Sequence, residues 1–395
     1  MVNGPTPQNQ YGSYDISAAQ LLLIPQLAKT VKNGSRIVLV PPPPEQMATA
    51  TLPESELPST PSIPGARQLC AAYGWATTKK LKTDTLAAVP PAPAVSAVGV
   101  MDIGQGNCNM LIGQPGGGGT ADVLAYYDTG YPLFFYYSSL PPTMRFGAQQ
   151  YAGPIRNNQP NNLRVILSHW DWDHWRLGAV AALNNLQWTV PNQPVGPATA
   201  NFFRTLANVN TINAGTPPVG GPGNSTIYCC FPSVNPVPIA MIMNNTGLAL
   251  SVPMVLPSTL TAVRQAVLTG DANFNSVPLT LLTRANMTGI IAVHHGSNAH
   301  GAAQNLPAPV ANIDGRIAYS YGITTNGNHA YGFPALAAVA AYQNGGWTAD
   351  RSTAEGQNIN LAGQANRGNV LMGRNVAMLA AYNNTAFATF PNQLN

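Results

Sequence analysis

The chain has 395 residues, of which 45% are hydrophobic and only 8% are Asp, Glu, Lys or Arg, and its net charge is +4. This length and apolar fraction suffice for one large domain with a buried core and a smaller accessory region. All five lysines precede residue 83, so no basic stripe marks a duplex-binding face. No apolar run reaches the roughly 20 residues that a membrane-spanning helix needs.

The N-terminus and the cysteines bear on the cellular compartment. The first residues lack a basic region followed by an apolar stretch, so we expect no signal peptide. The four cysteines include the adjacent pair Cys229 and Cys230, and no C-x-x-C pair occurs. We therefore expect reduced, buried thiols and a cytoplasmic protein.

Residues 1–94 are rich in proline, with four consecutive prolines at 41–44. Such density favours extended, semi-rigid chain. The pattern allows a helix at 17–31 and a strand at 37–40. We interpret this region as an N-terminal extension or small accessory region. It could be a linker, or an arm that docks a protein partner.

Residues 95–395 form the second predicted domain, in which short apolar runs alternate with helical patterns. One helix is predicted at 179–186. The order indicates an α/β sandwich. The predicted strands, in chain order, are 95–101, 110–112, 123–127, 165–168, 249–255, 266–269 and 290–293.

The run His169-Trp170-Asp171-Trp172-Asp173-His174 is the main chemical signal. Asp171 and Asp173 are the only acidic residues between Thr129 and Gly270. Four potential ligands in six positions, after a strand and before a helix, favour a site for zinc, manganese or iron. The alternative is a surface turn that caps the next helix, but capping needs one such residue rather than four.

Three further strands end in residues of the ligand type. Asp128 follows one apolar strand, Asp271 follows another, and the pair His294 and His295 follows a third. A lone Asp at a strand end is usually a turn residue. Together the three segments repeat one design, in which a strand ends in a side chain able to bind or orient a metal.

In this order, these segments resemble the metallo-β-lactamase domain of the ComEC/Rec2-like proteins over roughly residues 95–340. The motifs concerned are Asp102-Ile103-Gly104-Gln105-Gly106-Asn107, Asp128-Thr129-Gly130, Ser168 to His174, Thr269-Gly270-Asp271 and His294-His295-Gly296-Ser297. The resemblance implies a four-layer αββα sandwich with two divalent metal ions, Zn or Mn, at one edge.

The resemblance also implies a role for each ligand. His169 and Asp171 would hold the first metal, while Asp173, His174 and one of His294 and His295 would hold the second. Asp271 would bridge the two ions. Asp128 would orient the ligands from behind, as metal-bound histidines usually require. The residues that would take part in catalysis are Asp271, Asp173 and His295.

The chain departs from the family pattern at several positions. No histidine occurs between His174 and His294, so an amide oxygen of Asn244 or Asn245, or a water, would have to complete the first site. The first site should therefore bind its metal more weakly than the second. His329 lies four residues before a Phe-Pro pair that replaces the usual His-Pro, and it is a further candidate near the substrate.

Trp172 and Arg176 flank the metal motif. Trp172 could stack on a base or sugar, or it could pack against the sheets. Arg176 could contact a phosphate with two hydrogen bonds.

The favoured function is metal-dependent hydrolysis of a phosphodiester, in single-stranded DNA or a nucleotide, by a metal-bridged hydroxide. The first alternative is a carboxylic ester or lactone hydrolase. The second is a binding module that keeps the fold and the metal without turnover. The ComEC proteins also carry a membrane channel domain, and the present sequence shows no segment of that kind, so we do not expect a role in DNA import through its own pore.

Overall fold

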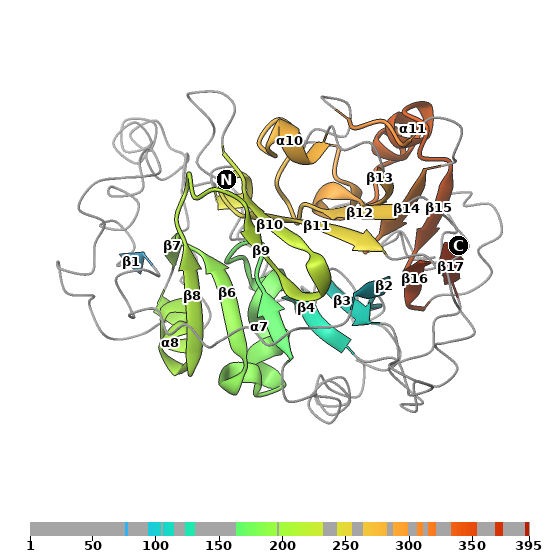
Figure 1. Cartoon of the computed structure of the whole chain (residues 1–395). Coiled ribbons are helices and arrows are strands. Elements are labelled where there is room, and N and C mark those ends of the chain that lie inside the picture. Colours follow the sequence, from blue (N-terminus) through green and yellow to red (C-terminus); the bar gives the residue numbers. More distant parts are fainter. Residues whose placement is uncertain are drawn as a thin grey trace, which may run out of the picture.

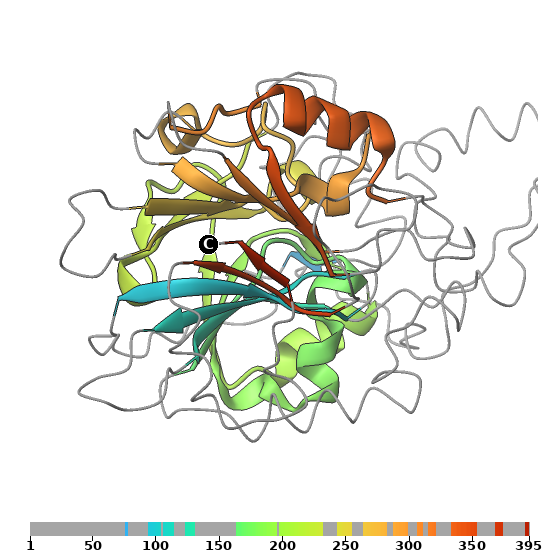
Figure 2. The same cartoon turned by 90° about the vertical axis from the view of Figure 1, so that its right-hand side faces the viewer.

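The computed structural model describes the parts of the chain that build the sheets, their helices and the candidate site. Figures 1 and 2 show them as four layers, with two sheets face to face and helices on the outer faces. The described residues are 76–77, 94–103, 106–113, 123–130, 163–195, 197–231, 243–254, 264–282, 287–298, 306–310, 315–320, 333–353, 368–373 and 392–394.

The first sheet is mixed and has eight described strands. Its central strands β2, β3 and β4 are buried almost throughout, because a sheet covered on both faces needs continuous apolar runs. The strand order is β17 (Asn392–Leu394), β16 (Val370–Gly373), β2 (Val95–Val100), β3 (Cys108–Gly113), β4 (Val123–Thr129), β5 (Arg164–Ile166), β6 (Gln187–Pro191) and β8 (Asn208–Ile212).

The second sheet has seven described strands, with parallel pairing from β12 to β15 and antiparallel pairing elsewhere. A separate pair joins β1 (Ala76–Thr77) to β7 (Pro194–Val195). The order in the second sheet is β15 (Ala349–Ser352), β14 (Arg316–Tyr319), β13 (Met287–Ile291), β12 (Arg264–Leu268), β11 (Leu248–Met254), β10 (Thr226–Cys229) and β9 (Val219–Gly220).

Three separate hydrophobic cores account for the four layers. One lies between the sheets and joins residues such as Val100 of β2 and Leu250 of β11. A second lies under the first sheet, where Trp175 and Phe203 pack from α7 (Trp172–Val180) and α8 (Pro197–Thr205). The third joins the second sheet to α10 (Leu279–Leu282) and α11 (Leu336–Asn344) through residues such as Tyr342. The αββα sandwich predicted from the sequence is confirmed.

The predicted strands all fall on observed ones, but two boundaries were wrong. The helix predicted at 179–186 was misplaced: α7 spans Trp172–Val180, because Asp171 has the extended conformation of an N-cap and the left-handed Ala182 ends the helical path. The strand predicted to reach Val293 ends at Ile291 and gives way to a tight turn, η8 (Val293–Gly296).

The N-terminal prediction lies mostly outside the described residues, including the helix at 17–31 and the strand at 37–40. Among the described residues, no helix combines the length and the hydropathy needed to span a bilayer. The described cysteines, Cys108, Cys229 and Cys230, are free and buried.

Candidate metal centre

The predicted ligands come together where strands of both sheets end. His169 follows β5, Asp271 follows β12, and His295 follows β13. Backbone hydrogen bonds tie these ends together, because Leu248 N–H donates to the Ser168 carbonyl at 2.7 Å and His294 N–H donates to the Gly270 carbonyl at 3.1 Å. The site therefore lies at one edge of the sandwich, and its residues come from both sheets.

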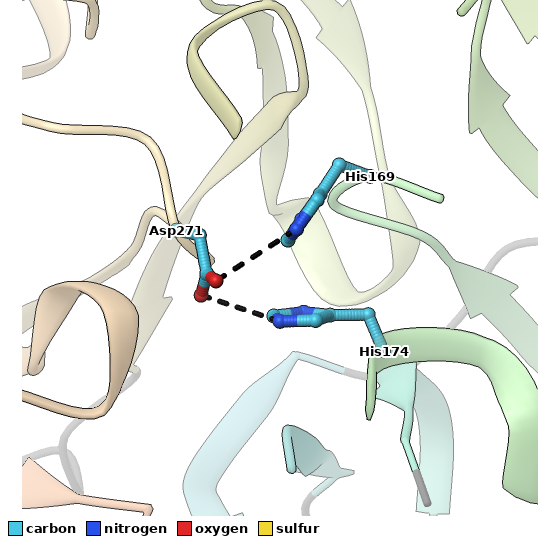
Figure 3. A group of neighbouring side chains, drawn as sticks. All are labelled: His169, His174 and Asp271. Carbon is cyan, nitrogen blue, oxygen red and sulfur yellow. Dashed lines mark ion pairs between the residues drawn. The ribbon is translucent and has the colours of Figure 1, made fainter. Parts of the chain in front are cut away.

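The Asp271 carboxylate, 2% exposed, faces two histidines with its two oxygens (Figure 3). Its Oδ1 lies 3.2 Å from His174 Nε2, and its Oδ2 lies 3.8 Å from His169 Nε2. Two ligand atoms bound to one ion at about 2.1 Å lie roughly 3 Å apart. Each Asp271 oxygen therefore has a histidine nitrogen beside it, and the carboxylate could hold a metal ion.

A second group of ligand atoms lies on the His174 side. Asp173 Oδ2 is 3.3 Å from His295 Nε2, and Asp173 Oδ1 is 3.9 Å from His174 Nε2. These three buried side chains offer ligand atoms within 4.8 Å of one another. His169, His174 and Asp271 form another such group. His174 belongs to both, but one imidazole nitrogen binds one ion.

The rear nitrogens of the three histidines are held by oxygen partners. Asp128 accepts hydrogen bonds from His174 Nδ1 at 2.9 Å, from Ser168 Oγ at 2.8 Å and from Ser168 N at 2.6 Å. Ser168 Oγ also lies 3.0 Å from His169 Nδ1. Ser320 Oγ lies 2.7 Å from His295 Nδ1. Each ring therefore presents Nε2 to the site, as metal-bound histidines with oriented rear nitrogens do.

Two buried atoms test whether the residues fit a metal. His174 Nε2 and Asp271 Oδ1 are both buried and have no hydrogen-bond partner in the described structure. With Nδ1–H bonded to Asp128, the neutral ring turns a lone pair towards the carboxylate oxygen. Leaving two such acceptors face to face costs free energy, and a cation between them removes the cost. The residues fit a divalent metal.

The charges indicate the same need for a cation. Burial alone would raise the pKa of the Asp271 carboxyl, but the imidazoles of His294 and His174 hold that pKa well below its ordinary value. Burial alone would lower the pKa of His174, yet the carboxylates of Asp271, Asp128 and Asp173 raise that pKa well above its ordinary value. A divalent ion among these carboxylates would supply the positive charge that they attract.

His294 and His295 are adjacent but face different partners. Both have positive φ, at 45° and 56°, and their rings stand nearly perpendicular at 88°. His295 is fully buried and points at Asp173, with Nε2 at 3.3 Å from Asp173 Oδ2. The His294 side chain is 20% exposed, with Nδ1 at 3.2 Å from Asp271 Oδ2.

The remaining predicted residues are more peripheral. Asp171 Oδ2 lies 3.1 Å from His169 Nε2, but its side chain is 47% exposed, so this is the open side of the site. Asn245 Oδ1 accepts a hydrogen bond from the backbone N–H of Asn273 at 3.0 Å, so this side chain holds the chain after Asp271 in place. The Arg176 guanidinium lies over the Trp172 ring at 4.7 Å. His329 lies outside the described residues.

Sequence reasoning missed the roles of Ser168 and Ser320. Ser168 directly precedes the metal motif, and Ser320 directly follows β14. Ser320 thus repeats the pattern of a polar residue after an apolar strand that was used for Asp128 and Asp271. The strand before it was not among those predicted from the sequence, so Ser320 was missed together with its strand.

We expect Asp128→Asn to weaken metal binding by about 10- to 100-fold, the usual cost of losing a partner behind a metal-bound histidine. Asn tolerates the positive φ of 63° at this position, so the backbone should persist while the charge that fixes His174 is lost. Isothermal titration of the metal-free protein measures the effect. Asp350→Asn, which changes a buried carboxylate on β15, is the control. Unchanged metal affinity in Asp128→Asn would refute the orienting role.

Comparison with known proteins gives structural matches only. No family model and no curated protein sequence matches the chain. A metal-dependent hydrolase of the β-lactamase superfamily, Tm1679, is similar at a TM-score of 0.37 and 9% identity, covering 65% of this chain and 95% of that one. The metallo-β-lactamase fold protein YhfI from Bacillus subtilis is similar at 0.26 and 16%, covering 50% and 71%.

A point mutant of the β-hydroxylase CmlA is similar at a TM-score of 0.33 and 11% identity. That match covers 65% of this chain and spans half the length of CmlA. The chemistry of this protein therefore has to be inferred from the geometry of its own site.

Proposed function

We propose that the protein is a metal-dependent hydrolase with two divalent ions, Zn or Mn, and that it cleaves phosphodiesters. The observation that carries the proposal is the buried Asp271 carboxylate, which faces His174 with one oxygen and His169 with the other. Divalent ions in such a centre act as Lewis acids and make water nucleophilic near neutral pH. The ComEC/Rec2-like resemblance of the motifs supports the same class.

Some residues of the chain would hold the metal ions, and others would orient the histidine rings that bind them. His174 and His295 would hold one ion with Asp173, and Asp271 would hold both ions. Asp128 and Ser320 fix the rings from behind, so the ligand atoms need little rearrangement when metal enters. Asp171, on the open side, marks where substrate would approach.

Arg176 favours a phosphodiester over a carboxylic ester or lactone. Its guanidinium is held over Trp172, one helical turn after Asp173, and it has no carboxylate partner among the described residues. A guanidinium fixed in this way keeps its donors available for two oxygens of a phosphate. A neutral ester has no comparable pair of charged oxygens to offer.

The test is a substrate panel on the full chain loaded with Mn²⁺ or Zn²⁺. Bis(p-nitrophenyl) phosphate and a single-stranded oligonucleotide should be hydrolysed, and chelation should abolish the activity. Faster cleavage of a p-nitrophenyl carboxylic ester or a lactone would favour the alternative substrate class. Metal binding without turnover of any of these would favour a binding module.

Replacing Arg176 with Ala should raise KM for the phosphodiester by about tenfold or more, because a hydrogen bond to a charged group contributes roughly 1.5–3 kcal/mol. The helix should persist, since Ala is a good helix former. Arg204→Ala on α8, whose guanidinium donates to Asn201 on its own helix, is the matched control. An unchanged KM would remove Arg176 from the substrate site.

We also propose that residues 95–395 form the hydrolase domain and that 1–94 are accessory to it. All the residues assigned to the metal centre lie between Asp128 and Ser320. Localisation in the cytoplasm, with a protein partner at the N-terminal region, remains part of this proposal.

A further inference from the structure

The turn η8, which carries both histidines of the pair, has a strained backbone. Three of its residues, His294, His295 and Gly296, have positive φ, at 45°, 56° and 86°. Most residues other than glycine adopt this conformation at a cost in free energy, and it persists only where the surrounding structure holds it. The directions in which the two imidazoles point therefore depend on the contacts that hold this turn.

Backbone hydrogen bonds hold the turn to the chain on either side of β13. His294 N–H donates to the Gly270 carbonyl, which follows β12, at 3.1 Å. Ala292 N–H donates to the Ala318 carbonyl of β14 at 2.9 Å, and Ser297 N–H donates back to the His294 carbonyl at 2.9 Å. These contacts join backbone atoms, so they persist when a side chain is replaced.

Helix α11 contacts both ends of the turn. At its N-cap, Ala335 donates its N–H to the Gly296 carbonyl at 2.9 Å. Further along, the Tyr342 hydroxyl accepts the Val293 N–H at 3.2 Å. Seven residues are about two turns of an α-helix, so Ala335 and Tyr342 lie on one face, and this face packs against the second sheet.

The contact of Tyr342 differs from the backbone contacts because a side chain makes it. Tyr342 is 0% exposed and Val293 is 1% exposed. Burial raises the pKa of the Tyr342 hydroxyl, so this group is neutral and accepts the hydrogen bond through a lone pair. Without the hydroxyl, the Val293 N–H would be a buried donor that has lost its partner, which costs free energy.

The backbone of the turn places both rings beside carboxylates. His295 Nε2 lies 3.3 Å from Asp173 Oδ2, and His294 Nδ1 lies 3.2 Å from Asp271 Oδ2. Val293 directly precedes the two histidines, so a rotation of its backbone would move both rings. Metal ligands have to be held within about 0.5 Å of their binding geometry. Release of the Val293 N–H would therefore affect metal binding.

We propose that Tyr342 is a positioning residue for the metal centre, because its hydroxyl holds the turn that points His295 towards Asp173. The inference rests on the proposed metal-dependent function. Tyr342 would touch neither the metal nor the substrate and would act through the backbone of Val293. Helix α11, none of whose residues is a proposed ligand, would then contribute to the affinity of the folded protein for metal.

The test compares the full-length, metal-free wild type with Tyr342→Phe, which removes the hydroxyl and keeps the ring. Isothermal titration with ZnCl₂ should show binding weakened by about tenfold or more, in the range for hydrogen-bond partners behind a metal ligand. Tyr319→Phe is the matched control. The Tyr319 ring packs 6.1 Å from that of Tyr342, and its buried hydroxyl has no hydrogen-bond partner in the described structure. This control should bind zinc as the wild type does.

Cobalt gives a readout that a merely structural role of Tyr342 would not change. Co²⁺ accepts the same nitrogen and oxygen ligands as Zn²⁺, and its visible absorption depends on the number and geometry of those ligands. At saturating Co²⁺, Tyr342→Phe should give a spectrum that differs from that of the wild type, because the His295 imidazole is displaced. Tyr319→Phe should give the wild-type spectrum.

Several outcomes would overturn the inference. A folded Tyr342→Phe variant with wild-type zinc affinity, or with the wild-type cobalt spectrum, would do so. An equal loss of affinity in Tyr319→Phe would attribute the effect to packing, and loss of the fold in Tyr342→Phe, seen by circular dichroism, would make the hydroxyl structural. All of these would leave the proposed function standing. No metal binding by the wild type, together with no hydrolysis, would instead refute the proposed function.

Discussion

Replacing Asp271 with Asn should lower kcat/KM for a phosphodiester by at least about 100-fold, because even groups behind a metal ligand change activity 10- to 100-fold. The amide keeps the shape of the carboxylate but loses its charge, and it turns an NH₂ group towards one of the two histidines. Both ions would lose a ligand at once. Metal content after dialysis should fall together with the rate.

The control for Asp271→Asn is Asp350→Asn, which removes charge from a buried carboxylate that accepts a hydrogen bond from Gln343. It should keep its metal and its rate. The circular dichroism spectrum of Asp271→Asn should match that of the wild type. A folded Asp271→Asn variant with wild-type rates and metal content would show that this carboxylate is not a shared ligand.

Gly130→Ala should destabilise the protein by about 3 kcal/mol, at the upper end of the usual cost of overpacking. A Cβ at Gly130 would overlap the Asp173 carbonyl oxygen and stand 2.8 Å from the Asn107 carbonyl oxygen. Both obstacles are backbone atoms, so no side chain can rotate away. Asn107 N–H donates to the same Asp173 carbonyl at 2.9 Å, so the start of α7 would have to move.

Because Asp173 would move with α7, Gly130→Ala should also weaken metal binding. Urea unfolding and metal titration measure the two effects. Gly220→Ala is the matched control, since a Cβ there meets nothing within 4 Å, and its stability should stay within about 0.5 kcal/mol of the wild type. Equal stability of the two variants would contradict the close approach of β4 and α7.

Sequence reasoning located the strands that carry the ligands because those strands are buried on both faces. Residues such as Leu124 and Ile166 leave an apolar signal that ends at a polar side chain. The edge strand β15 gave no such signal. It contains Asp350 and Arg351, and its place in the sheet depends on parallel pairing with β14.

The residue types of the candidate site could be predicted from the sequence, but the role of each residue could not. The sequence left the choice between His294 and His295 open. Two successive left-handed residues turn the rings towards different partners, and that difference is the basis for proposing His295 as the ligand. Asn244 and Asn245 are equivalent in sequence, but Asn245 Oδ1 accepts the Asn273 backbone N–H whereas Asn244 Nδ2 lies beside His294 Nδ1. Such choices depend on contacts between residues far apart in the chain.

The position of the ligands along the chain has a consequence for protein synthesis. Asp173 and His295, which meet in the folded protein, are 122 residues apart in the sequence. Chains emerge from the ribosome N-terminus first, so His169 to His174 are exposed well before the strands bearing Asp271 and His295 exist. The early motif alone is an incomplete ligand set. The newly made protein should therefore acquire its metal only after the second sheet has joined the first.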